Sequence, residues 1–211
     1  MKKMDIKVFY QKNKSSDCGP VSTQMVLNHF GKGMSLEEIK AKMTYVPGGT
    51  YIYDNGLVVL RKGLSAELVT ANPLLFKQEE RVSLKNEQDV LKHLNSIKRK
   101  KNSKKSAITL FQDFIKNGGR VKVQIPTIEH IVKAIDNNKL IIGLLYGGAL
   151  GRREGGFHFI VVTGYKKGFV HINNPGKRSR QGWFPEKDFL YALHSSTCVD
   201  VDNGSLLIVG E

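Results

Sequence analysis

The sequence has few cysteines and no long apolar run, and both shortages exclude classes of protein. Its 211 residues include two cysteines, Cys18 and Cys198, which are too few for a disulfide scaffold and lack the spacing of a metal site. A single bridge between them stays open, although a chain without an export signal disfavours it. The start, MKKMDIKVFYQKNK, interleaves charges with apolar residues and fits neither a secretory signal nor a membrane span. We therefore expect a cytoplasmic protein without metal or cofactor, while export that needs no cleaved signal stays open.

The sequence is also poor in acidic residues relative to basic ones. It has 33 Lys and Arg against 19 Asp and Glu, a formal net charge of +14. Such an excess predicts attraction to an anionic partner, which could be nucleic acid, a membrane surface or an acidic protein. The run IKRKKNSKK gathers basic residues between Lys98 and Lys105. We interpret it first as a solvated helix end or loop and second as a binding patch. It has no interleaved aromatic residues, which disfavours a stacking platform for single-stranded nucleic acid.

The hydrophobic periodicity changes near the middle of the chain. From Ser35, which with Glu38 forms a capping box, to Lys116 the pattern is mostly helical. From Arg120 strand-like segments follow, with one helix over about 127–136: RVKVQIP, KLIIGLLYG, FHFIVVTGY, GFVHINNP and SLLIVG. Helices followed by mostly antiparallel strands predict an α+β fold. We expect a single domain over 1–211, with the helices before about residue 119 and the sheet from about residue 120. Within the segment 45–76, PGGTYIYDNG has the composition of a loop, and the sequence leaves open whether this segment closes as a lid over a functional site.

Cys18 stands at the expected start of a helix, in SSDCGPVSTQMVLNHFG. Pro20 falls in the first turn, where a missing N–H group costs little, and Gly31 falls at the end. The helix dipole and the N–H groups at that start favour a thiolate, which is the nucleophilic form of cysteine. The same N–H groups can stabilise the oxyanion of a tetrahedral intermediate. Position alone leaves a nucleophile and a small buried hydrophobe equally open.

A thiolate nucleophile needs a base, and His158 is the candidate among the six histidines. It opens the apolar segment HFIVVTG, at the mouth of an expected buried strand. His29, His93, His130 and His194 lie in or near expected helices, and we interpret them as surface or packing residues.

A hairpin around YKKG brings a third polar residue to this base. With Lys166 at its midpoint, Asn174 lies opposite His158 across an antiparallel pair, with the Cβ atoms about 5 Å apart. Asn174 would then hydrogen-bond one imidazole nitrogen and leave the other to face Cys18. A register shift of one residue selects Asn173 instead, and NNPG is also compatible with a plain turn.

Four short motifs occur along the chain in this order: Gln11, Asp17-Cys18-Gly19-Pro20, the strand GFHFIVVTGY from Gly156, and Ile172-Asn173-Asn174-Pro175. Together they resemble the bacteriocin-processing, double-glycine-leader cysteine peptidases of the papain-like clan. The resemblance implies a papain-like cysteine peptidase fold over most of the chain, weakest over 34–105. It also implies that Cys18 is the nucleophile, that His158 is the base and that Gln11 lines the oxyanion hole.

The sequence departs from that family at three points. Asn174-Pro175 stands where the family usually has Asp-Pro, although papain itself uses an asparagine. No membrane or ATP-binding domain follows, so we do not expect a bacteriocin exporter. The basic insertion around 98–105 is not required by the family.

The leading hypothesis is a cysteine-dependent amide hydrolase with Cys18, His158 and Asn174 as a triad and Gln11 in the oxyanion hole. Its substrate could be a peptide with a Gly-Gly leader or a glutamine side chain, which the same machinery would deamidate; acyl transfer is also open. The positive charge favours an acidic protein or peptide. The alternative is a catalytically inactive, peptidase-like module that binds nucleic acid or an acidic protein, with an affinity that falls steeply with salt where nucleic acid is the partner.

Overall fold

The computed structural model describes residues 1–98, 104–150, 156–177, 179–197 and 199–211. These residues form an α+β fold, which confirms the predicted class. The strands are β1 (Lys2–Lys3), β2 (Ser65–Thr70), β3 (Arg120–Val123), β4 (Leu140–Tyr146), β5 (Phe157–Lys166), β6 (Phe169–Asn173), β7 (Gly182–Pro185) and β8 (Leu206–Gly210). The helices are α1 (Cys18–His29), α2 (Leu36–Lys40), α3 (Ile52–Arg61), α4 (Gln78–Ser83), α5 (Glu87–Lys98), α6 (Lys105–Lys116), α7 (Ile128–Asp136), α8 (Glu186–His194) and the short 3-10 helix η2 (Gly147–Leu150). The predictions made for Cys198 and for residues 99–103 of the basic run lie outside the described residues.

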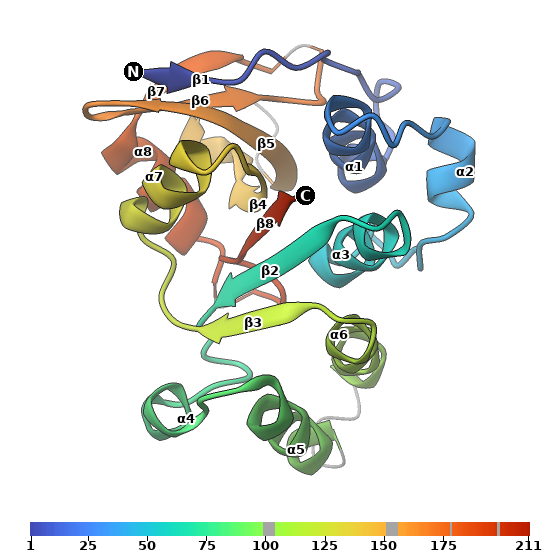
Figure 1. Cartoon of the computed structure of the whole chain (residues 1–211), viewed down its shortest axis with the longest axis vertical. Coiled ribbons are helices and arrows are strands. Elements are labelled where there is room, and N and C mark those ends of the chain that lie inside the picture. The colour runs from blue at the N-terminus through green and yellow to red at the C-terminus, as the bar shows by residue number, and fades with distance from the viewer. Residues whose placement is uncertain (99–103, 151–155, 178, 198) are drawn as a thin grey trace.

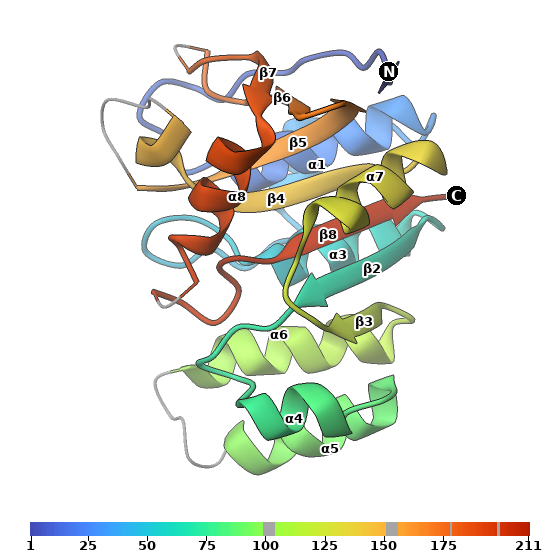
Figure 2. The ribbon, with the colours of Figure 1, turned by 90° about the vertical axis from the view of Figure 1, so that its left-hand side faces the viewer.

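One sheet runs through the molecule in the order β3-β2-β8-β4-β5-β6-β7, and β1 pairs with β5. Its pairs are antiparallel apart from β2 and β3, which are parallel. Helices α1, α3 and α6 lie on one side of the sheet, and α7 and α8 lie on the other (Figure 1). Turned by 90°, the molecule shows α7 and α8 in front of the sheet and α1 and α3 behind it (Figure 2).

This layering explains the apolar runs in the second half of the sequence. A strand covered on both faces buries successive side chains, so it loses the alternation of apolar and polar residues. In β4, LIIGLLY, every residue except Tyr146 is buried, and β8, LLIVG, is buried throughout. The core therefore lies on both faces of the central strands. Strand β5, which lies between β4 and β6, is buried over most of its length.

The loop prediction for PGGTYIYDNG, residues 47–56, is wrong over its second half. Residues 52–61 form α3, and residues 52–59 are buried. Ile52, Tyr53 and Leu57 follow helical spacing and face the core. Burial of this apolar face outweighs the turn tendency of Asn55-Gly56, since tertiary packing overrides weak local propensity.

Much of the same segment is built into the sheet and the helix that covers it. After α3 the chain continues into β2, which pairs with β3 on one side and with β8 on the other. Strand β2 was not expected in this half of the chain, and it lies inside the sheet. Opening residues 45–76 as a whole would break that pairing, so a lid that includes α3 and β2 does not fit this fold.

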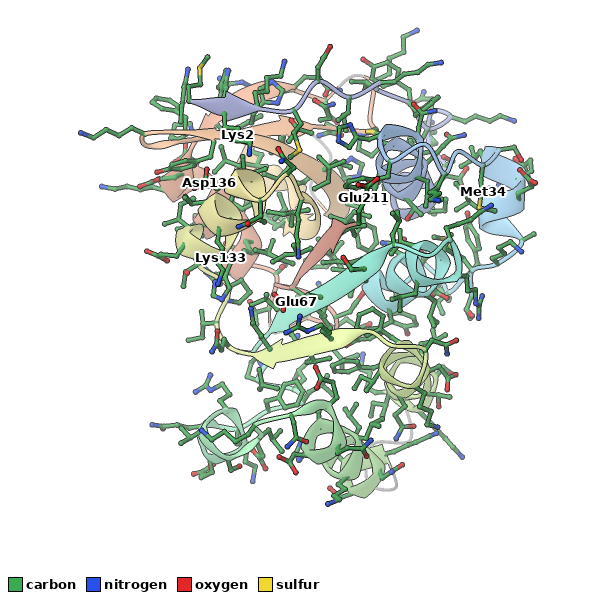
Figure 3. All side chains as sticks on the ribbon, viewed as in Figure 1. Lys2, Met34, Glu67, Lys133, Asp136 and Glu211 are labelled. Carbon is green, nitrogen blue, oxygen red and sulfur yellow. The ribbon has the colours of Figure 1, made fainter. Side chains whose placement is uncertain are left out.

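Long-range side-chain contacts join β1 to α7 and β2 to β3. The Lys2 Nζ atom donates a hydrogen bond of 2.7 Å to the carbonyl of Asp136 at the end of α7, and these two residues lie together in Figure 3. At the edge near β3, Glu67 pairs with Lys122 at 2.9 Å and with Arg120 at 4.0 Å. Beyond that edge α4 and α5 extend the molecule (Figure 2). No helix in the described parts of the chain is long and apolar enough to cross a membrane.

Candidate active site

Cys18 is the first residue of α1, as the sequence predicts. Asp17 is the N-cap, Pro20 lies in the first turn, and Gly31 follows the helix with a φ of +67°. Cys18 is 9% exposed. Its sulfur therefore sits where the partial positive charge of the helix N-terminus favours an anion, in surroundings largely shielded from water.

Gly19 allows the start of α1 to approach the strand that carries His158. A Cβ atom at Gly19 would overlap Thr50 Oγ1 and would lie 3.2 Å from both Asn55 Oδ1 and the ring of Phe159. Phe159 is the neighbour of His158 in β5, and α1 packs on this strand. The residues next to Cys18 and next to His158 are thus in close contact, which only a residue without a side chain permits at this position.

The carboxylate before Cys18 has its own partners. The Tyr45 hydroxyl donates a hydrogen bond of 2.7 Å to Asp17 Oδ1, and Lys40 Nζ lies 3.7 Å from Asp17 Oδ2. Burial, followed by the hydrogen bond to Asp17, raises the pKa of Tyr45 well above its ordinary value. Tyr45 therefore remains a donor at any physiological pH, and the negative charge of Asp17 is held by this donor and by a cation.

His158 and Asn174 form a buried hydrogen bond, with 2.7 Å between His158 Nε2 and Asn174 Oδ1. Their exposed fractions are 3% and 7%. The N–H group of Gly176 donates to the same Oδ1 atom at 2.8 Å, which identifies that atom as the acceptor. Nε2 of the imidazole therefore carries a proton, and Nδ1 is the nitrogen on the opposite side of the ring. Asn173, the alternative third residue, instead lies opposite Val161 in the strand ladder.

The register predicted for this hairpin is wrong by two residues. Val161 pairs with Asn173 and Val162 with Ile172, so the same register places Asn174 opposite Ile160, two residues after His158. The turn is shorter than predicted, because Lys166 pairs with Phe169, and the register shifts between Val162 and Gly164. His158 and Asn174 are diagonal neighbours, and their long side chains bridge the offset.

Gln11 joins this arrangement through the residue after Asn174. Its backbone N–H group donates a hydrogen bond of 2.9 Å to the carbonyl of Pro175, and its side-chain Nε2 donates to the carbonyl of Ser15 at 3.0 Å. The segment before α1 is therefore fastened to the segment that carries Asn174. An amide nitrogen carries two protons, so the bond to Ser15 uses one and leaves the second for another acceptor.

His93, His130 and His171 have hydrogen-bond partners of their own. His93 in α5 contacts the carbonyl of Leu75 at 2.8 Å, and His130 belongs to the capping box of α7. His171, which sequence reasoning did not weigh, contacts Thr163 Oγ1 at 2.7 Å, and burial lowers its pKa to about 4. Among the described residues no three potential metal ligands of the His, Cys, Asp and Glu types come together.

Sequence reasoning missed Gln181, which contacts the backbone of Asn174. Gln181 Oε1 accepts a hydrogen bond of 2.7 Å from the Asn174 N–H group, and its Nε2 donates to the Asn174 carbonyl at 2.6 Å. Nothing in the local sequence around Gln181 signals this contact, since its partners are backbone atoms that every residue type presents.

Comparison with known proteins identifies the family of this chain. The sequence profile of the Peptidase_C39 like family matches residues 3–192. A putative C39-like peptidase from Bacillus anthracis shares the fold, with 11% identity over 99% of this chain and 98% of that chain and a TM-score of 0.57.

Two further structures are similar over nearly their whole length, each with a TM-score of 0.49. A double glycine motif protease from an AMS/PCAT transporter, in complex with the leader peptide, is 16% identical over 100% of this chain and 95% of that chain. The peptidase domain of Streptococcus ComA, a bifunctional ABC transporter, is 14% identical over 97% of both chains. A search of curated protein sequences found no match. With 190 consecutive positions matched, the chain belongs to the Peptidase_C39 like family, which supports a function of the cysteine peptidase type.

Proposed function

We propose that the chain is a cysteine-dependent amide hydrolase in which Cys18 is the nucleophile, His158 the general base and Asn174 the residue that orients the imidazole. The observation that carries the proposal is the buried hydrogen bond between His158 Nε2 and Asn174 Oδ1, beside a helix that begins at Cys18. Membership of the family supports a peptide as the substrate class.

The first half of the reaction forms an acyl-enzyme. The proton of the Cys18 thiol passes to Nδ1 of His158, and the sulfur attacks the carbonyl carbon of the amide to form a C–S bond. The carbonyl oxygen becomes an oxyanion, which the N–H group of Cys18 and the second proton of Gln11 Nε2 stabilise. When the C–N bond breaks, the imidazolium gives its proton to the leaving nitrogen. A thioester to Cys18 remains.

The second half releases the acid. His158 takes a proton from water, the resulting hydroxide attacks the thioester carbon, and the C–S bond breaks with its electrons returning to sulfur. Asn174 keeps the ring in one orientation through both halves, because it accepts from Nε2 whether the imidazole is neutral or charged. The cycle therefore needs no group beyond the side chains named and water.

The pH dependence of alkylation at Cys18 tests the proposal without a substrate. Peptide mass spectrometry resolves Cys18 from Cys198, which serves as the internal reference. In the unmodified protein we expect Cys18 to react well below the ordinary thiol pKa of about 8.5. In His158→Ala that advantage is lost. A Cys18 that titrates as an ordinary thiol in both proteins contradicts the proposal.

The substrate class is tested by offering two peptides side by side. One carries a Gly-Gly leader junction and the other an accessible glutamine in a sequence without that junction. Chain cleavage identifies a peptidase, and a mass gain of about 1 Da at glutamine identifies a deamidase. Each activity must fall by at least about a thousandfold in Cys18→Ala, since the thiolate makes the covalent bond. Turnover that persists in folded Cys18→Ala rules out this mechanism.

A further inference from the structure

The ladder between β6 and β7 stops just before Asn174. Its last pair is Ile172 with Gly182, and Gly182 has a φ of +100°, a conformation that turns the chain away from the strand direction. Asn174 lies two residues beyond this last pair. The backbone of β7 therefore provides no partner for it.

The side chain of Gln181 supplies the hydrogen bonds that the backbone of β7 does not provide to Asn174. Its Oε1 accepts from the Asn174 N–H group at 2.7 Å, and its Nε2 donates to the Asn174 carbonyl at 2.6 Å. A primary amide offers one acceptor and one donor side by side, the same pair that a residue of a neighbouring strand offers. Gln181 thus extends the sheet by one pair with its side chain, and both backbone polar groups of buried Asn174 are satisfied.

We propose that Gln181 is a positioning residue that sets the orientation of His158 through Asn174, an inference that rests on the proposed function. The two hydrogen bonds from the Gln181 side chain fix the backbone of Asn174. The Gly176 N–H group donates to the Asn174 Oδ1 atom at 2.8 Å and fixes its position. That oxygen then lies 2.7 Å from His158 Nε2. Pro175, which follows Asn174, accepts a hydrogen bond from the backbone N–H group of Gln11. The segment that Gln181 holds is therefore also in contact with the glutamine proposed for the oxyanion site.

The experiment compares Gln181→Leu and Gln181→Glu with the unmodified protein and with a matched control. Leucine removes both bonds at similar volume. Glutamate keeps an acceptor for the Asn174 N–H group but, when ionised, has no donor for the carbonyl. The control is Gln112→Leu, because the amide of Gln112 in α6 also makes two hydrogen bonds, to Asn95 at 2.7 Å and to Lys98 at 3.2 Å. Gln112 is buried and Gln181 is half-buried, so the control is the more demanding test of the fold.

The measured quantity is the rate of Cys18 alkylation from about pH 4 to pH 9, with Cys198 as the internal reference. When Gln181 no longer holds Asn174, the imidazolium is less well oriented to stabilise the thiolate. We expect the pH midpoint of Cys18 to rise by about one in Gln181→Leu, which lowers the rate about tenfold at pH values well below both midpoints. Gln181→Glu should lie between Gln181→Leu and the unmodified protein, and Gln112→Leu should keep the unmodified profile even where its melting temperature falls.

The outcomes separate this inference from the proposed function. If Cys18 of the unmodified protein titrates like Cys198, the proposed function fails and this inference fails with it. If the unmodified protein shows the low midpoint and both Gln181 variants keep it, the positioning role alone is overturned. Circular dichroism confirms folding of each variant, and if Gln181→Leu does not fold, Gln181→Glu decides the question.

Discussion

Replacing Asn174 with Asp would place a negative charge at the oxygen that contacts His158. Asn174 Oδ1 accepts from His158 Nε2 at 2.7 Å and from the Gly176 N–H group at 2.8 Å. A carboxylate oxygen accepts both bonds as well, so the geometry is retained and a charge is added. With charge centres about 4 Å apart and an effective dielectric constant of about 20, the attraction to an imidazolium is about 4 kcal/mol. Burial of the new carboxylate offsets part of this energy, so we expect the pKa of His158 to rise by about 1 to 3.

An NMR titration of the His158 ring measures this change directly. A Cys18→Ser background removes the thiolate, so that only the effect of residue 174 is recorded. Asn173→Asp is the matched control, because it adds the same charge one position earlier, and adjacent side chains of a strand point to opposite faces. The reasoning is refuted if the pKa of His158 rises by less than about 0.5 in Asn174→Asp, or if it rises equally in both variants.

Three further changes give separate results. Gln11→Ala should lower kcat about 100-fold or more by removing an oxyanion donor, while Cys18 alkylation keeps its pH profile; a shifted profile would contradict the oxyanion role. Gly19→Ala should lower the free energy of unfolding by about 1–3 kcal/mol, measured in urea, because the added Cβ overlaps Thr50 Oγ1; an unchanged unfolding midpoint would contradict the close approach. Burial raises the pKa of Asp202 to about 7, well above an unfolded value of about 3.9. The native state therefore loses stability as the pH rises from about 4 to about 7, by an amount on the order of 4 kcal/mol. Asp202→Asn should remove this loss, and an equal decline in both proteins between pH 4 and pH 8 would show that Asp202 is not its source.

Local signals in the sequence suffice to predict where Cys18 lies. Pro20 in a first turn and Gly31 after the last turn are short-range features, and they fix the start and the end of α1 without knowledge of the rest of the fold. The apolar run after His158 likewise predicts a strand that is buried on both faces. Residue type and spacing therefore place the candidate nucleophile and the candidate base on their elements.

The contact between His158 and Asn174 is present although the register from which it was predicted is wrong. The two-residue period of a strand explains why the contact survives the error. The true pairing differs from the predicted one by two residues, since Val161 pairs with Asn173. An even offset keeps a side chain on the same face of the sheet, whereas an odd offset moves it to the other face. Asn174 therefore stays on the face of His158. The short turn and the irregularity near Thr163 that cause the offset have no clear signal in YKKG.

Contacts between distant residues explain what local signals cannot predict. The N–H group of Ile52, at the start of α3, donates to Asp202 Oδ2 across 150 positions of sequence, so the residue that stabilises this helix start is absent from the neighbourhood of PGGTYIYDNG. Gln181 is a similar case, because its partners are the backbone N–H and C=O groups of Asn174. Every non-proline residue presents those two groups, so no choice of side chain at position 174 reveals them in the sequence. Residues that perform chemistry can be recognised by their type and spacing, but the residues that hold them in place can be recognised only from the contacts of the folded chain.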